Sequence, residues 1–314
     1  MNFARKIKML IFFFFIFYSN SQNSIALENK ILFKIDSEII TTIDIYEEIK
    51  FLKIFNPEIN SLSKEELFEI SKNSILKDRI KKIEILNYVK ELKVNDKFLL
   101  NLVRNKYSIE NINSLENLDK YLINNNLDIN TIKEKFAIEL IWNDIIYQKF
   151  SEKIKIDKEK IKKEILQNPK RENQRELLLS EIVFNINDKI EFEKKYKKIL
   201  LDIKKLGFKK SAIIHSNSDT ASNGGLIGWV KEDNLNQSIK KVISKLQPGQ
   251  FSKPIRTSSG FIIVKIEDKK VYKSEFNLNK KIDEVIRFKT NYQLNQFSSI
   301  YFNRLKKNLS IYGL

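Results

Sequence analysis

The chain has 314 residues, of which 42% are hydrophobic and 31% charged, and its formal net charge is +17. This length allows two domains and this hydrophobic content supplies their cores, so general disorder is excluded. The chain contains no cysteine, which excludes disulfide frameworks, thiol nucleophiles and lipid attachment through cysteine. No metal or cofactor motif accompanies the single histidine, so we expect neither a metal nor a cofactor.

The first 26 residues have the pattern of an export signal. A basic segment from Arg5 to Lys8 precedes an apolar segment at 10–18, and a small-x-small site ends at Ala26. We therefore expect export with cleavage after Ala26. The alternative, an uncleaved membrane anchor, needs about 18 apolar residues in a row. No later segment approaches that length, so we expect no stable membrane insertion.

The positive charge is spread along the whole chain. Removal of the three basic residues of the signal leaves a net charge of +14. Such a balance suits nucleic acid or an anionic membrane surface. Because the lysines are not gathered in one stretch, and because an exported protein rarely meets nucleic acid, we expect no nucleic-acid partner.

The part at 27–170 is predicted to be mostly helical. A short strand at 29–37 leads into a helix capped by Thr41 or Thr42. The capping box that begins at Ser63 predicts a long helix to about Leu92. Further helices are expected at 95–106, 115–124, 130–153 and 157–167. We interpret the aromatic residues of the helix at 130–153 as core, with a peptide-binding surface as the alternative.

The apolar period changes near 170–175, which predicts a domain boundary. A strand at 176–186, a helix at 189–206, a turn region, a helix at 237–246 and a strand at 260–266 form a small α+β unit over 175–268. A helix at 277–307 then has one apolar face and is expected to dock, with the rest of 274–314, on the N-terminal helices. The fold class is therefore α+β, a mostly helical domain with an inserted α+β domain.

Turn residues are concentrated between His215 and Ile266, which holds five of the seven glycines of the chain. Gly224 and Gly225 permit positive φ angles at a sharp turn, and Pro248-Gly249 forms another turn. This crowding in a glycine-poor chain predicts a compact, turn-dependent domain.

Three motifs in this segment resemble the parvulin family of peptidyl-prolyl isomerases, also called the rotamase or PpiC family. They are NGGLIGW at 223–229, LQPGQ at 246–250 with Pro254-Ile255, and Ser259-Gly260-Phe261. They occur in the family's order and spacing. The resemblance covers about 175–268 and implies a small antiparallel sheet with surrounding helices.

The wider layout resembles the SurA family of periplasmic chaperones. An export signal, an N-terminal strand and helical domain, a parvulin domain and a C-terminal helix follow one another, with one parvulin unit where the usual layout has two. The resemblance implies a periplasmic foldase whose clients are unfolded polypeptides, outer-membrane proteins above all. It also implies that the C-terminal residues form a strand against 31–36.

The resemblance assigns site residues as well. Parvulins place two histidines beside a Cys or Asp below an apolar proline pocket, and here Glu181 and Ile262 stand at the histidine positions and Ser218 at the third. The substrate-binding positions correspond to Ile227, Leu235, Ile239 and Phe261. The resemblance therefore implies an apolar pocket in which the polar residues at the base differ from those of the family.

Two single residues have a simpler interpretation. His215 is the only imidazole, but no partner pattern accompanies it, so we interpret it as a structural or surface residue. Glu181 is expected to face solvent at a strand end. The alternative is a carboxyl that lines the pocket near Ser218 with a raised pKa.

Three functions stay open at this point. The first is a chaperone of the SurA type that binds extended polypeptide without confident catalytic residues. The second is an active prolyl isomerase that tolerates the substitutions, since much of the rate enhancement could come from desolvation and twisting of the amide. The third is an electrostatic binder of anionic surfaces.

Overall fold

The computed structural model describes residues 29–107, 112–167, 173–186, 188–273 and 277–313. The expected signal at 1–26 lies outside these residues. The described chain is mostly helical with two small antiparallel sheets, and this confirms the predicted α+β class.

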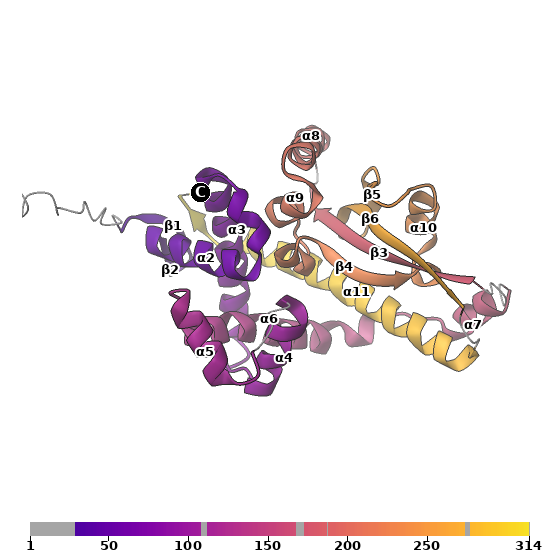
Figure 1. Ribbon diagram of the computed structural model, residues 1–314, viewed down its shortest axis with the longest axis horizontal. Helices are drawn as coiled ribbons and strands as arrows, with labels where there is room; N and C mark the ends of the chain where they lie inside the picture. The colour runs from indigo at the N-terminus through magenta and orange to yellow at the C-terminus, as the bar shows by residue number, and fades with distance from the viewer. Residues whose placement is uncertain (1–28, 108–111, 168–172, 187, 274–276, 314) are drawn as a thin grey trace, which may run out of the picture.

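The N-terminal part is a helical domain closed by a small sheet (Figure 1). Its helices and short 3-10 turns are α2 (Thr42–Phe55), η1 (Pro57–Ser61), α3 (Lys64–Ile85), α4 (Asp96–Tyr107), α5 (Leu115–Asn124), α6 (Ile129–Phe150), η2 (Ser151–Lys153) and α7 (Lys158–Gln167). The sheet has the order β2-β1-β7, built from β1 (Ile31–Ile35), β2 (Glu38–Thr41) and β7 (Ile311–Tyr312). The last strand therefore pairs with the first, which brings the C-terminal end to the N-terminal domain.

Local capping sets the starts of the first helices. Thr41 accepts a hydrogen bond from the Asp44 amide, and the Asp44 carboxylate accepts one from the Thr41 amide at 2.8 Å. Ser63 and Glu66 form the same reciprocal pair at the start of α3. Both capping residues are the predicted ones, because each pair satisfies two amides that have no partner inside the helix.

The second domain is an antiparallel sheet of four strands between two helical layers (Figure 1). The strand order is β4-β3-β6-β5, with β3 (Asn173–Phe184), β4 (Leu226–Lys231), β5 (Ile255–Thr257) and β6 (Gly260–Lys273). Its helices and 3-10 turns are α8 (Lys189–Leu206), α9 (Phe208–His215), η3 (Asp219–Asn223), η4 (Glu232–Asn234) and α10 (Gln237–Ile243).

The two faces of this sheet have different coverings. Ile182, Phe184 and Ile263 pack with α8 and α9 on one face. Leu179, Val183, Ile262 and Val264 pack with α10 on the other, where the side chains of Phe288 and Tyr292 join them. The last two residues belong to α11 (Leu278–Asn308), a helix that also contacts α3, α6 and α7 and so links the two domains.

Several sequence predictions were wrong in detail. The first long helix ends at Ile85 rather than near Leu92, because the chain enters tight turns in which the Tyr88 amide donates to the Ile85 carbonyl. Strand β2 occupies the residues between the predicted strand and the predicted helix, to which the sequence analysis assigned no element, since pairing with β1 holds them extended. The predicted turn region also contains α9 and β4. Gly228 interrupts the alternation of β4, and this strand forms through pairing with β3.

Candidate functional site

The three residues at the family's catalytic positions lie together. Glu181 of β3 pairs with Val264 of β6, and Ile262 lies two residues from Val264, so Glu181 and Ile262 project from the same face of the sheet. Ser218 precedes η3, which follows α9. All three line a small cavity of about 90 Å³. The structure therefore brings together a carboxyl, a hydroxyl and an aliphatic side chain, the set that the sequence placed there.

A glycine fixes the loop that carries Ser218 against the strand that carries Glu181. Gly225 has a φ angle of +78°, and a Cβ atom at this position would lie 2.2 Å from the Glu181 carbonyl oxygen. The Glu181 amide also donates to the Gly225 carbonyl at 2.8 Å. Only glycine permits this close approach, so the paired glycines seen in the sequence position the site.

A chain of hydroxyl groups ends at the Glu181 carboxyl. The Thr220 hydroxyl donates to Glu181 Oε1 at 2.9 Å and lies 2.7 Å from Ser218 Oγ. Ser218 Oγ is 2.8 Å from Ser216 Oγ, which accepts from the Val183 amide at 2.9 Å. Because the Val183 amide donates to Ser216, the Ser216 hydroxyl can donate to Ser218, and the Ser218 hydroxyl can donate to Thr220. All hydrogen bonds of this series therefore point toward the Glu181 carboxylate.

The environment of Glu181 favours its neutral form. Burial raises the pKa of this carboxyl to about 7, against the lowering effect of the Thr220 and Ser218 hydroxyl groups, and nearby Asp219 raises it further. The expectation that Glu181 faces solvent was wrong, because the loop at Ser218 covers this end of β3. A carboxyl that titrates near neutral pH can accept or donate a proton under physiological conditions.

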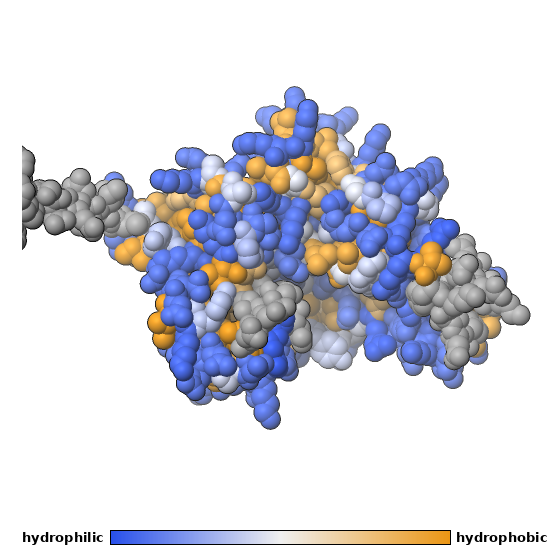
Figure 2. All heavy atoms as spheres, in the orientation of Figure 1, coloured by the Kyte–Doolittle hydropathy of each residue, from blue (hydrophilic) through white to orange (hydrophobic). Residues whose placement is uncertain are grey.

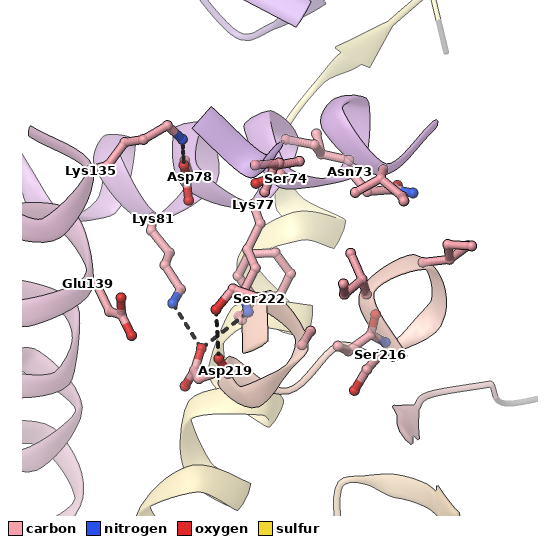
Figure 3. Close-up of a pocket in the computed structure, with 18 of the residues that line it drawn as sticks. Asn73, Ser74, Lys77, Asp78, Lys81, Lys135, Glu139, Ser216, Asp219 and Ser222 are labelled. Carbon is pink, nitrogen blue, oxygen red and sulfur yellow. Dashed lines mark hydrogen bonds and ion pairs between the residues drawn. The ribbon is translucent and has the colours of Figure 1, made fainter. Parts of the chain in front are cut away.

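Asp219 lies next to Ser218 but faces the helical domain. Lys77 and Lys81 of α3 approach Asp219 Oδ1 to 3.2 Å and 3.0 Å, as Figure 3 shows. Burial would raise the pKa of Asp219, but the two ammonium groups hold it far below its usual range. Lys77 also donates to the Ser218 carbonyl at 3.1 Å. The loop that carries Ser218 is thus tied to the other domain.

Two of the four predicted substrate residues lie together. Leu235 and Ile239 are buried in one apolar cluster with Ile262. Ile227 is 39% exposed on β4 and lies outside that cluster. Phe261 lies on the opposite face of the sheet, where its ring stacks on Phe184. Side chains alternate along a strand, so Phe261 and its neighbour Ile262 cannot share a face.

An apolar groove of about 510 Å³ opens beside Leu235 and Ile239. Helix α11 forms its second wall. The apolar lining residues are Leu235, Ile239, Phe288, Tyr292, Phe297 and Ile300.

The sequence analysis missed the contribution of α11. The spacing of Phe288, Tyr292 and Gln296 is a signal that could have found it, because residues four apart lie on one side of a helix. This stripe is separate from the residues through which α11 packs on the helical domain, such as Tyr301 and Leu305.

The same helix closes the polar floor. Tyr292, Gln296, Ser299 and Phe302 of α11 line the small cavity together with Glu181 and Ser218. A peptide that reaches Glu181 has to displace this part of α11 or enter from its side. The groove beside Leu235 is open in the same arrangement.

His215 is a structural residue, as predicted. Its ring is 4% exposed, Nε2 lies 2.6 Å from Asp202 Oδ2, and Nδ1 lies 3.3 Å from Lys195 Nζ. Burial and the Lys195 charge lower the pKa of His215 to about 4 despite Asp202. The ring is therefore neutral near pH 7, with Nε2–H donating to Asp202 and Nδ1 accepting from Lys195.

The residues that the structure describes contain neither a candidate membrane span nor a candidate metal site. None of their helices combines the length and the apolar character that a membrane span requires. Within the same residues, no group of three or more His, Cys, Asp and Glu side chains could hold a metal ion.

Comparison with known proteins identifies the second domain. Residues 178–268 match the family model described as "Rotamase: PPIC-type PPIASE domain". The chain is 41% identical over 81 residues to the "Chaperone SurA" of Hahella chejuensis. This aligned segment is 26% of this chain and 19% of that protein. It is 28% identical over 165 residues to the "Chaperone SurA" of Pseudomonas aeruginosa. This aligned segment is 50% of this chain and 40% of that protein. The chain thus matches less than half the length of these relatives.

Among solved structures, the parvulin domain of PpiD from E. coli is similar at 30% identity. The match covers 32% of this chain and 91% of that domain, with a TM-score of 0.26. Residues 178–268 of this chain therefore form a PPIC-type PPIase domain of the rotamase family, in a chain homologous to SurA chaperones.

Proposed function

We propose that the protein is a periplasmic foldase that binds unfolded polypeptides in the groove between α10 and α11. Outer-membrane protein precursors are the clients that the family resemblance found in the sequence implies. The observation that carries this proposal is the apolar groove, which combines two substrate positions of the PPIase domain, Leu235 and Ile239, with Phe288 and Phe297 of α11.

The chemistry of the groove favours extended chains rich in apolar and aromatic residues. Its rings and aliphatic side chains can bury apolar side chains at about 25 cal/mol per Å² of removed surface. Polar groups such as Asn234 and Gln293 stand at its lining and can pair with the backbone of a bound peptide. This combination selects for unfolded polypeptide rather than for one sequence.

Binding is favoured over catalysis because of the position of α11. The groove is accessible, whereas the floor at Glu181 is covered by residues of that helix. The histidine positions of the family hold Glu181 and Ile262, and the second of these has no proton to exchange.

The test is suppression of aggregation. An outer-membrane β-barrel protein unfolded in urea is diluted into buffer with the chain from Leu27, and light scattering is recorded. Ile300→Asp places a charge in the groove at a residue that is 44% exposed, so folding should tolerate it. We expect most of the suppression to be lost.

Ile123→Asp is the matched control, since Ile123 is a 60% exposed residue of α5. Equal suppression by wild type and Ile300→Asp, or equal loss in both variants, would contradict the groove as the client site. An equal effect on a soluble client without aromatic segments would contradict the preference for outer-membrane proteins.

Export and periplasmic location are part of the proposal. They are supported by the basic, apolar and small-residue segments that end at Ala26. Fractionation of the producing cells, with N-terminal sequencing of the recovered protein, should give a periplasmic chain that begins at Leu27. Recovery in the membrane fraction with the first residues intact would contradict it.

A second function, prolyl isomerisation, is favoured by the hydroxyl chain that ends at Glu181. A carboxyl with a pKa of about 7 beside Val183 and Ile262 could hydrogen-bond to a twisted amide, in which the C–N bond has lost part of its double-bond character. Catalysis by this floor would require α11 to move away from it.

A protease-coupled assay on an Ala-Pro peptide tests this second function. Activity above background that Glu181→Gln reduces and Leu235→Asp abolishes would support an active isomerase. Turnover no faster than the uncatalysed reaction would leave the protein as a binding foldase, which the aggregation assay measures independently.

A further inference from the structure

Helix α8 has an apolar stripe that packs on the sheet and, on its opposite side, an exposed stripe of aliphatic residues and lysines. The inner stripe contains Phe192, Tyr196, Ile199 and Ile203, which pack on the sheet. The outer stripe repeats the same spacing two residues earlier, with Ile190, Lys194, Lys197, Leu201 and Lys204. Residues at these intervals lie on one side of a helix, and an offset of two residues places that side opposite the inner one.

The outer stripe is exposed. Ile190 and Leu201 are 67% and 58% exposed, and Lys194, Lys197, Lys198 and Lys204 are exposed around them. In Figure 1 the helix stands at the edge of the molecule, and in Figure 2 apolar atoms lie among hydrophilic ones in this region.

Among the described residues, no ion pair joins Lys194, Lys197, Lys198 or Lys204 to a carboxylate, whereas Lys205 on the border contacts Glu66 at 3.2 Å. Glu191 and Glu193 of the same helix are exposed as well, but the four lysines outnumber them, so this side of α8 keeps a net positive charge.

We propose that the outer face of α8, defined by Ile190, Lys194, Lys197, Lys198, Leu201 and Lys204, docks on the surface of a bilayer that contains acidic phospholipids. The charge of the face is complementary to such a surface, and each lysine near it contributes to binding. Ile190 and Leu201 are eleven residues apart, which corresponds to about 16 Å along a helix axis. Both can enter the boundary between headgroups and acyl chains while the helix lies flat.

A bilayer fits this face better than an acidic protein does. The long lysine stems can extend sideways to phosphates while the two aliphatic side chains enter the apolar layer below. An acidic protein surface would satisfy the lysines but would need two separate apolar pockets for Ile190 and Leu201. The proposal is independent of the client groove, which lies on the other side of the sheet.

The test uses the chain from Leu27, which keeps every described residue, and vesicles of phosphatidylcholine with a minor fraction of phosphatidylglycerol. Binding is measured by co-sedimentation at low and at physiological salt. The wild type should bind these vesicles, should not bind phosphatidylcholine alone, and should bind less as salt rises. Failure to bind the acidic vesicles at low salt would overturn the proposal.

The variant K194Q/K197Q/K198Q/K204Q removes four charges from the face. Each lysine is expected to contribute a factor of about five, so the affinity should fall at least about a hundredfold. The matched control is K158Q/K160Q/K162Q/K163Q, which removes four exposed lysines of α7 that do not form one stripe. We expect it to lose less than about tenfold, and an equal loss in both variants would overturn the assignment to α8.

The variant I190S/L201S keeps the charge and removes the two aliphatic groups. We expect a loss of about tenfold, since each group is partly buried on docking. Soluble poly-glutamate is measured in parallel. If I190S/L201S binds vesicles like the wild type while the wild type binds poly-glutamate as tightly as vesicles, the face is a site for acidic polypeptide and the membrane proposal is wrong.

Discussion

Glu181 and Asp219 are two carboxyl groups that line the same small cavity and have opposite pKa shifts. Both residues are half-buried, and 30% of the Asp219 side chain is exposed. Glu181 receives hydrogen bonds from hydroxyl groups only, and its pKa rises to about 7. Asp219 receives two ammonium groups, Lys77 and Lys81, and its pKa falls far below its usual range. Burial alone therefore does not decide the charge state in this cavity.

The two carboxyls differ in the groups that contact them, and these groups come from different parts of the chain. The hydroxyls beside Glu181 belong to the PPIase domain itself, at Ser218 and Thr220. The lysines beside Asp219 belong to α3 of the helical domain. The hydroxyl partners of Glu181 are thus supplied within one domain, whereas the ammonium partners of Asp219 depend on the contact between the two.

Asp219→Asn should have the largest effect. It removes the carboxylate that contacts both Lys77 and the buried Lys81 at the domain contact, and a buried charge without its partner costs about 3 kcal/mol in free energy of unfolding. Because the pKa of Asp219 is lowered, its stabilisation is fully present above the usual pKa of an aspartate and is lost as the pH falls through the lowered value. Urea unfolding at pH 7 should therefore show the full loss.

Asp233→Asn is the control for this variant. Asp233 also contacts two lysines, Lys240 at 3.1 Å and Lys281 at 2.9 Å, but it is 40% exposed. Water screens these pairs, so we expect a loss of less than about 1 kcal/mol. Equal losses at the two aspartates would contradict the distinction between the domain contact and the surface.

Glu181→Gln should have an intermediate effect with a defined pH dependence. The raised pKa means that the folded protein binds more protons than the unfolded one between about pH 4.5 and 7. The stabilising contribution of the neutral form is complete below this window and is lost as the pH rises through it. Glutamine cannot ionise, so at pH 8 the free energy of unfolding of the variant should exceed that of the wild type by about 2 kcal/mol. At pH 4 the two proteins should be equally stable.

Unfolding in urea at several pH values measures this difference. Glu176→Gln, which removes another carboxyl from β3, is the control for the loss of one negative charge. A stability gain for Glu181→Gln that is the same at pH 4 and pH 8 would show that the carboxyl is not held neutral.

Ser218→Ala should have the smallest effect. It interrupts the hydroxyl chain and costs about 1 kcal/mol, the usual contribution of one hydrogen bond. Because the Ser218 hydroxyl lowers the pKa of Glu181, that pKa should rise in the variant. NMR titration of the glutamate side-chain carbons measures the shift, and Ser222→Ala, which loses only a contact of 3.4 Å to the Asp219 carbonyl, should leave it unchanged.

Much of the fold could be predicted from local signals. The capping pairs at Thr41 and Ser63, the turn glycines and the period change before β3 are all set by residues close in sequence. The helix end after Ile85 and the strands β2 and β4 could not, because they depend on tight turns and on pairing with β1 and β3.

The site was predictable in its position but not in its environment. Motif spacing placed Glu181, Ser218 and Ile262 together, and Leu235 with Ile239. It could not show that Phe261 points to the other face in this sheet, or that Glu181 is covered by the loop at Ser218. Nor could it show that α11 forms a wall of the groove.

By itself, the sequence determined the helix starts, the glycine turns and the residue types of the pocket, since each depends on neighbours within a few positions. Only the tertiary structure decided which of these residues share an environment. Burial raises the pKa of Glu181 against the hydrogen bond from Thr220, 39 residues away, and the charged state of Asp219 comes from ammonium groups such as that of Lys81, 138 residues away. Desolvation and ion pairing act through space, so the chemistry of the cavity is fixed only when the two domains are in contact.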